Sequence, residues 1–145
     1  MYRSLRGIAY LNLLAGAFAI AGCGGAKTFP VTGKVMLKGG KPLAGALVEF
    51  ETTQADGKRV TARGETQEDG SYTLETPELG AGAVAGDHKV IVSPPSYPPG
   101  NFEGPPPQSL LDKKYQSYST TPLKFKVQSS GPFVYDIEVT GPSRR

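Results

Sequence analysis

The chain has 145 residues, with 16 lysine and arginine against 13 aspartate and glutamate residues, and it contains one histidine, one cysteine and no tryptophan. This length fits a single domain. Two of the arginines lie in an N-terminal segment that we expect to be removed, and the remaining charges almost balance. The composition therefore gives no reason to expect a nucleic-acid partner.

The first 22 residues have the pattern of an export signal. Arg3 and Arg6 precede an almost wholly apolar segment at residues 8–20. As a helix this segment would extend roughly 20 Å, which is too short for the ~30 Å hydrocarbon core of a bilayer. We therefore expect residues 1–22 to be a cleavable signal peptide rather than a membrane-spanning helix.

The sequence Ile20-Ala21-Gly22-Cys23 follows the apolar segment. It resembles the lipobox of bacterial lipoproteins at all four positions; the alternative is an ordinary signal peptide with an incidental cysteine. A single cysteine is unusual in an exported protein, because oxidising compartments favour paired cysteines, and lipidation would account for it. The resemblance implies that Cys23 is the lipidated first residue of the mature protein and binds the membrane through its acyl chains.

Residues 23–30 are expected to be a lipidated tether between the membrane and the folded domain. When extended, this segment reaches at most ~25 Å, so the domain must lie close to the bilayer. Glycine, rather than aspartate, follows the cysteine at position 24. By resemblance to lipoprotein sorting in bacteria with two membranes, this implies a location in the cell envelope, at the outer membrane.

From Val31 onward apolar and polar residues alternate with a period of two, which is typical of half-buried strands. Turn sequences such as Asp69-Gly70 separate these segments. No helical segment lies between them, so parallel pairing, which needs a crossover, is not expected. The pattern predicts an all-β, antiparallel sandwich or barrel of seven strands, with residues 76–86 as a loop. The expected strands span residues 31–38, 46–51, 59–65, 71–75, 88–92, 123–127 and 133–139.

Residues 93–114 interrupt the alternating pattern, because this segment holds seven of the 13 prolines. Proline cannot donate a hydrogen bond to a sheet, so the segment is expected to be an irregular or polyproline-like loop. Connections of this length in a compact domain are usually functional or disordered. Tyr97, Phe102, Tyr115 and Tyr118 are candidate partner-binding residues that could stack on a peptide or a glycan. The alternative is that they hold the loop against the sandwich.

The remaining polar residues do not form a catalytic or metal-binding pattern. His88 is the only histidine, so we expect neither a pair of histidine metal ligands nor a Ser-His-Asp triad, and we assign it a structural role. Glu65, Glu68 and Asp69 are the densest carboxylates, but calcium needs about six to eight converging oxygens. We interpret them as a solvated rim, and we expect no catalytic residue, no metal site and no cofactor.

Four sequence motifs resemble, in order and spacing, those of the carboxypeptidase regulatory-like domain, above all in small bacterial lipoproteins that carry one such domain. The resemblance covers residues 31–140 and leaves residues 141–145 as a tail. It implies a seven-stranded Greek-key sandwich of the transthyretin (prealbumin) type. The motifs are VTGKV at 31–35, GKPLAGA at 40–46, DGSYTL at 69–74 and GDHKV at 86–90.

These features together indicate a membrane-anchored, non-catalytic lipoprotein that acts as a binding or structural module, with an envelope protein or a glycan as its partner. One alternative is a lipoprotein that captures a glycan or peptide ligand. A hydrolase is a third and more distant interpretation. Hydroxyisourate hydrolases have a transthyretin-like fold, but they resemble one another in several histidines and a C-terminal Tyr-Arg-Gly-Ser, which this chain lacks.

Overall fold

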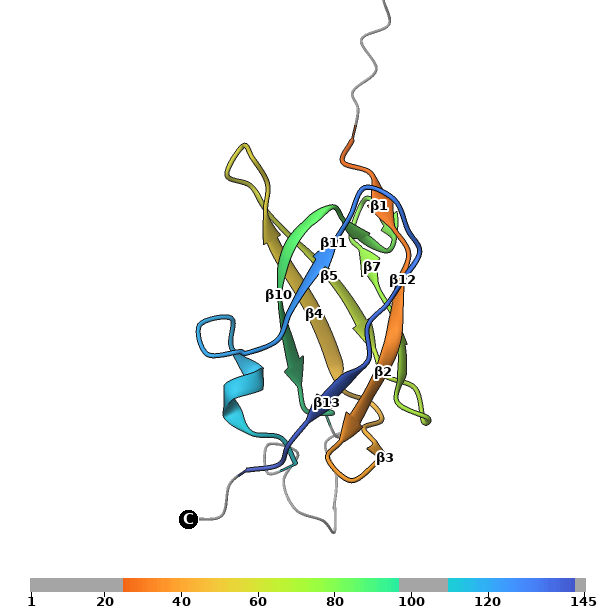
Figure 1. Cartoon of the computed structure of the whole chain (residues 1–145), viewed down its shortest axis with the longest axis vertical. Helices are drawn as coiled ribbons and strands as arrows, with labels where there is room; N and C mark the ends of the chain where they lie inside the picture. Colours follow the sequence, from red (N-terminus) through yellow and green to blue (C-terminus); the bar gives the residue numbers. More distant parts are fainter. Residues whose placement is uncertain (1–24, 97–109, 143–145) are drawn as a thin grey trace, which may run out of the picture.

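The computed structural model describes residues 25–96 and 110–142, and these form a protein made almost entirely of strands (Figure 1). The expectation of an all-β fold is confirmed. The signal peptide, Cys23, Tyr97 and Phe102 lie outside the described residues. The elements are β1 (Thr28–Phe29), β2 (Val31–Leu37), β3 (Lys41–Pro42), β4 (Leu47–Thr53), β5 (Arg59–Glu65), β6 (Ser71–Thr73), β7 (Glu75–Thr76), β8 (Gly80–Ala81), β9 (Ala83–Val84), β10 (Gly86–Ser93), the 3-10 helix η2 (Lys113–Gln116), β11 (Lys124–Val127), β12 (Phe133–Val134) and β13 (Ile137–Val139).

The strands form two sheets that face each other in a sandwich-like arrangement (Figure 1). The larger sheet has the order β11-β10-β4-β5-β7-β8, and all its neighbouring strands are antiparallel. In the smaller sheet β2 is central, with β12 and β13 along one edge and β3 and β6 along the other. The short strands β1 and β9 form a separate antiparallel pair at one end of the sandwich.

The pairing of β2 with β12 and β13 is parallel, which corrects the expectation of purely antiparallel sheets. After β11 the chain passes over the end of the sandwich through residues 128–132 and enters the other sheet as β12 (Figure 1). A parallel connection within one sheet usually needs a helix to bring the chain back. Here the strands of the larger sheet return the chain to the starting end of β2. Residues 128–132 are therefore enough to connect β11 to β12.

The core lies between the two sheets, on the faces that the alternating pattern predicts. Phe50 is at its centre, with the rings of Tyr72, His88, Phe125 and Tyr135 at centroid distances of 5.9–6.4 Å. One residue departs from the alternation in β10: Ile91, on the opposite face from Val90 and Val92, is also buried, because η2 packs over β10. The largest fully buried side chains are Phe50, Leu74, Leu111, Ile137, Val31, Val35, Val48, Val84, Val90, Val92, Val127 and Val139.

The structure also corrects two expected segment boundaries at the end of the sandwich where β1 pairs with β9. Residues 76–86, expected to be a loop, contain β8, β9 and the end of β7. The expected tether is shorter than 23–30, because Thr28 and Phe29 pair with β9 and the Phe29 side chain is buried. Gly82 permits this contact, since a Cβ on it would lie 2.0 Å from the carbonyl oxygen of Phe29.

The proline-rich connection is likewise shorter than the expected 93–114. Ser93 ends β10, and from Leu110 the chain is again part of the described domain, with Leu111 fully buried. The carboxylate of Asp112 accepts a hydrogen bond from the backbone N–H of Lys114 (3.0 Å) at the start of η2. Both ends of the connection are therefore anchored in the sandwich.

A local interruption divides the last strand into β12 and β13. Between them, the carbonyl oxygen of Tyr135 accepts a hydrogen bond from the Tyr72 hydroxyl (2.6 Å), and a carboxylate oxygen of Asp136 accepts one from the backbone N–H of Lys34 (2.9 Å). Burial raises the pKa of the Tyr72 hydroxyl, which therefore remains a donor. Gly33 on β2 lies so close that a Cβ there would be 1.9 Å from the Tyr135 oxygen.

Candidate functional site

Tyr115, one of the candidate partner-binding residues, belongs to the core. Its side chain is only 6% exposed, and its hydroxyl lies 3.4 Å from the Thr140 hydroxyl. The ammonium group of Lys114 covers the ring at 4.9 Å from its centroid. A side chain with so little free surface offers almost nothing to a partner. The geometry of Tyr115 therefore matches the alternative interpretation, in which an aromatic residue holds this segment against the sandwich.

Tyr118 is half-buried on the outer face of the larger sheet. The Lys89 ammonium donates a hydrogen bond to its backbone carbonyl (3.2 Å). Burial raises the pKa of the Tyr118 hydroxyl, and the carboxylates of Glu49 and Glu51 raise it further. Within the described residues, Tyr118 and Tyr115 thus lie in different surroundings and do not form one aromatic surface.

His88 is 2% exposed and packs beside Phe50 in the core. Its Nε2 lies 2.8 Å from the carbonyl oxygen of Val84. Because a carbonyl only accepts, Nε2 carries the hydrogen, which leaves Nδ1 buried without a hydrogen-bond partner among the described residues. Burial lowers the pKa of the ring. A neutral, structural histidine is what this geometry supports.

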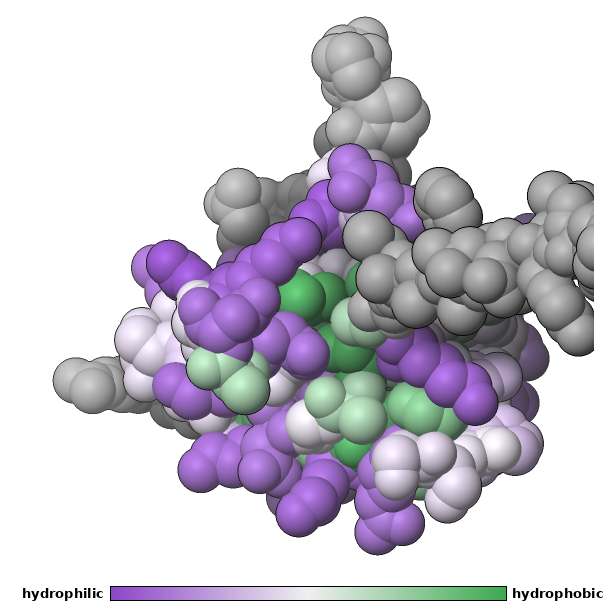
Figure 2. All heavy atoms as spheres, turned by 90° about the horizontal axis from the view of Figure 1, so that it is seen from above, coloured by the Kyte–Doolittle hydropathy of each residue, from purple (hydrophilic) through white to green (hydrophobic). Residues whose placement is uncertain are grey.

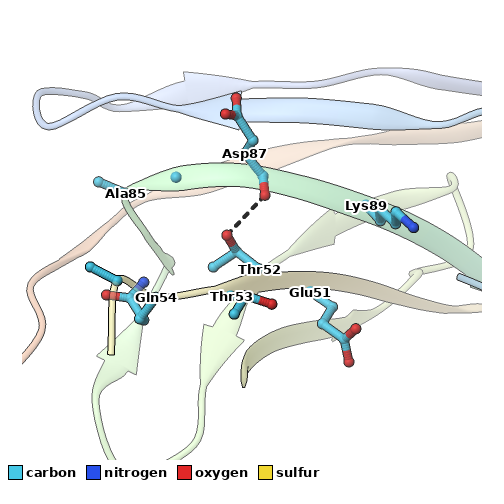
Figure 3. A pocket seen from close by; sticks show the side chains of 9 residues that line it. Glu51, Thr52, Thr53, Gln54, Ala85, Asp87 and Lys89 are labelled. Atoms are coloured by element: carbon cyan, nitrogen blue, oxygen red, sulfur yellow. Dashed lines mark hydrogen bonds between the residues drawn. The ribbon is translucent and has the colours of Figure 1, made fainter. Parts of the chain in front are cut away.

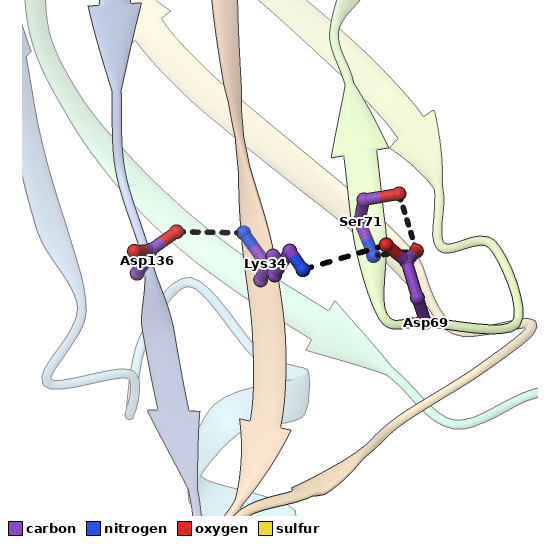
Figure 4. A network of polar contacts seen from close by, with 4 residues as sticks. All are labelled: Lys34, Asp69, Ser71 and Asp136. Carbon is purple, nitrogen blue, oxygen red and sulfur yellow. Dashed lines mark hydrogen bonds and ion pairs between the residues drawn. The ribbon is translucent and has the colours of Figure 1, made fainter.

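Glu65 and Glu68 are exposed, whereas Asp69 takes part in a structural network with Lys34 and Ser71 (Figure 4). Asp69 accepts hydrogen bonds from the Ser71 hydroxyl and from its backbone N–H (3.0 Å), and it pairs with the Lys34 ammonium at 3.4 Å. The bonds from Ser71 lower the pKa of Asp69 to about 2. Across the described parts of the chain, no three His, Cys, Asp or Glu side chains are grouped so that they could hold a metal ion.

A polar groove of about 560 Å³ opens beside the end of β4 and the start of β10 (Figure 3). The backbone pairing of these strands ends at Glu51 and Lys89. Beyond that pair the Thr52 hydroxyl donates to the carbonyl oxygen of Asp87 (2.8 Å). The groove can offer carboxylate, amide, hydroxyl and ammonium groups to a ligand rich in hydrogen-bonding groups. Its lining residues are Glu51, Thr52, Thr53, Gln54, Ala55, Ala85, Gly86, Asp87 and Lys89.

A second groove, of about 720 Å³, lies at the end of the sandwich where the described chain begins. It is lined by Gly25 and Ala26, by the turn between β4 and β5, by Arg59, Val60, Thr61 and Arg63 of β5, and by residues 76–79. Leu79 contributes an apolar side chain that is 37% exposed. The sequence patterns did not predict either groove, because each groove joins residues that are distant in the sequence and a local period does not show which segments meet.

Among residues 25–96 and 110–142, no helix is long and apolar enough to cross a membrane. Comparisons of the chain with protein-family models, with curated proteins and with solved structures find no match.

Proposed function

We propose that this chain is a lipoprotein of the bacterial cell envelope, anchored through a lipidated Cys23, whose β-sandwich is a non-catalytic binding or structural module. The observation that carries the proposal is the sequence of an apolar segment at residues 8–20, the four lipobox residues ending at Cys23, and a folded strand that begins at Thr28. A cleaved signal followed at once by a folded domain is the order that a lipid-anchored protein requires.

The energetics of lipid anchoring favour this interpretation. Each acyl CH₂ buried in the bilayer contributes about 0.8 kcal/mol, and one chain alone binds only marginally. A lipidated N-terminal cysteine carries two or three chains, so it would hold the domain durably without a membrane-spanning helix. Lipidation would also explain why the chain has one cysteine and hence no possible internal disulfide.

The transthyretin-like, Greek-key topology is the finer part of the proposal. Its support is the order in which the chain builds the two sheets. The strands β4 and β5 are antiparallel neighbours, β6 passes to the other sheet to pair with β2, and β10 returns beside β4. A strand that returns beside the first of a consecutive set is the defining feature of a Greek key.

The binding role rests on the groove drawn in Figure 3, whose lining includes the polar residues Gln54, Asp87 and Lys89. Such groups suit the hydroxyl and amide groups of a glycan or a peptide. An envelope protein or glycan is accordingly the partner that we propose, and the outer membrane is the proposed location.

The test is the variant Cys23→Ser, expressed with its signal in a bacterium fed a labelled fatty acid. We expect loss of the label and release of the protein from the membrane fraction, because a hydroxyl cannot replace the thiol that takes the lipid. Gly25→Ser is the matched control, since a side chain at Gly25 meets no atom within 4 Å. Undiminished labelling of Cys23→Ser would refute the proposal.

A further inference from the structure

The end of the sandwich at which β1 begins must lie beside whatever Cys23 is attached to. Gly25 lines the second groove together with Arg59 and Leu79. Two residues of extended chain reach at most about 7 Å, so Cys23 lies no farther than that from Gly25. We call this end the anchor face and define it as residues 25–27, the turn at residues 56–59 and the turn at residues 77–79.

The turn at residues 77–79 holds an apolar side chain in an exposed position. Leu79 and Val134 are the two large hydrophobic residues exposed within the described part of the chain. Glu78 lies immediately before Leu79. Among the described residues it is the only non-glycine residue with a positive φ, at 66°. Such a conformation is costly and persists where the surroundings impose it. Thr76 fixes this turn, since its buried hydroxyl donates to the Gly82 carbonyl (2.7 Å) and its own carbonyl accepts from the Leu79 N–H (3.1 Å).

Charged side chains of both signs line the second groove together with Leu79. Lys27 and Lys58 are exposed, and neither forms a salt bridge with another described residue. Asp56 and Glu78 lie on the same face. Figure 2, which looks onto this end, shows apolar residues in its middle and hydrophilic residues around them. A small apolar centre with a ring of mixed charge matches a surface whose headgroups each carry a cation and a phosphate.

We propose that the anchor face lies on the phospholipid bilayer, with Leu79 entering the interfacial region and Lys27 and Lys58 at the level of the phosphates. The inference rests on the proposed lipidation of Cys23 and adds to it a fixed orientation of the domain. The acyl chains bring the face to the bilayer, and contact of Leu79 with the interface then limits how the domain can tilt.

The absence of tryptophan from the chain permits a direct test. In the mature, lipidated protein, Leu79→Trp introduces a single tryptophan on the anchor face. Lys58→Trp provides a second probe on the neighbouring turn, in case the first substitution disturbs the turn at residues 77–79. Lys41→Trp is the matched control, because Lys41 is exposed in β3 at the opposite end of the sandwich (Figure 1).

Each variant is reconstituted into phosphatidylcholine vesicles with and without lipids brominated near the headgroup, which quench tryptophan on contact. Vesicle flotation is measured on the same samples. We expect all three variants to float, and we expect Leu79→Trp and Lys58→Trp to lose most of their fluorescence while Lys41→Trp keeps it. Floating protein with unquenched Leu79→Trp and Lys58→Trp, or with equal quenching of Lys41→Trp, would overturn the orientation alone. Protein that did not float would overturn the lipid anchor and the orientation with it.

Discussion

The interruption between β12 and β13 makes Gly33 the position where one added methyl group should do the most damage. In Gly33→Ala the new Cβ would lie 1.9 Å from the carbonyl oxygen of Tyr135, whereas carbon and oxygen atoms in adjacent strands normally stay about 3.3 Å apart or more. Neither atom can move away independently, because the Cβ is bonded directly to the Cα of β2 and the oxygen belongs to the backbone of Tyr135. The two strands must therefore separate by more than about 1 Å.

That separation lengthens two hydrogen bonds beyond their useful range. The Tyr72 hydroxyl donates to the Tyr135 carbonyl at 2.6 Å, and the Tyr135 N–H donates to the Thr32 carbonyl at 2.8 Å. Each bond contributes about 0.5–1.5 kcal/mol, and inserting a methyl group into a packed region costs about 1–3 kcal/mol. We therefore expect Gly33→Ala to lower the free energy of unfolding by about 2–6 kcal/mol, a large fraction of the ~5–15 kcal/mol typical of a domain.

Denaturant unfolding of the chain from Gly25 onward, without lipid, measures this loss. Gly25→Ala is the control, because its Cβ meets nothing within 4 Å and should change the free energy by less than about 0.5 kcal/mol. Tyr72→Phe, which removes only the hydroxyl, should cost about 1–3 kcal/mol by leaving the Tyr135 carbonyl without that donor. A loss below about 1 kcal/mol for Gly33→Ala would show that β2 and the interruption are not in close contact.

Two further predictions concern the core. Phe125→Ala should lower the free energy of unfolding by about 3 kcal/mol, because Phe125 packs on Phe50 but is partly exposed. Lys126→Ala, on the opposite face of β11, should lower it by less than about 0.5 kcal/mol. Equal losses in denaturant melts would contradict the facing of β11. Burial holds the pKa of His88 below the ~6.5 of an unfolded histidine, so its neutral form stabilises the fold above that pH, and stability should decline as pH falls below it. His88→Gln should flatten this decline in melts between pH 7 and 5, and an unchanged slope would assign the decline to other groups.

The positions of the principal strands could be predicted because each buries one face, and a buried face imposes a period of two. β5 matches the expected residues 59–65, and β2 ends one residue before the expected boundary. The break at Tyr135 and Asp136 left no signal, since an interruption of two residues keeps Phe133 and Ile137 on the same face. Two-residue strands such as β8 and β9 contain a single period of two, which is too short to show an alternating pattern.

The candidate site was less predictable, because residue type does not determine burial. Tyr115 and Tyr118 follow a proline-rich segment, which favours exposure, yet Leu111 and Tyr115 are drawn into the core next to β13. That contact joins residues distant in sequence and is invisible to local patterns. The grooves depend in the same way on contacts between distant segments: residues 51–55 and 85–89 form the first, and residues 25–26, 54–63 and 76–79 form the second.

The direction of β10 gives the molecule a definite polarity. The strand starts at Gly86, near β1, and ends at Ser93, where the chain leaves toward residue 110 at the opposite end (Figure 1). Eight residues of strand span roughly 25 Å. If Cys23 carries the lipid, the sandwich separates the bilayer from Ser93, where β10 ends, and from Leu110, where the described chain resumes. A macromolecule approaching from the periplasm or the cell exterior then meets these two residues before it meets any headgroup.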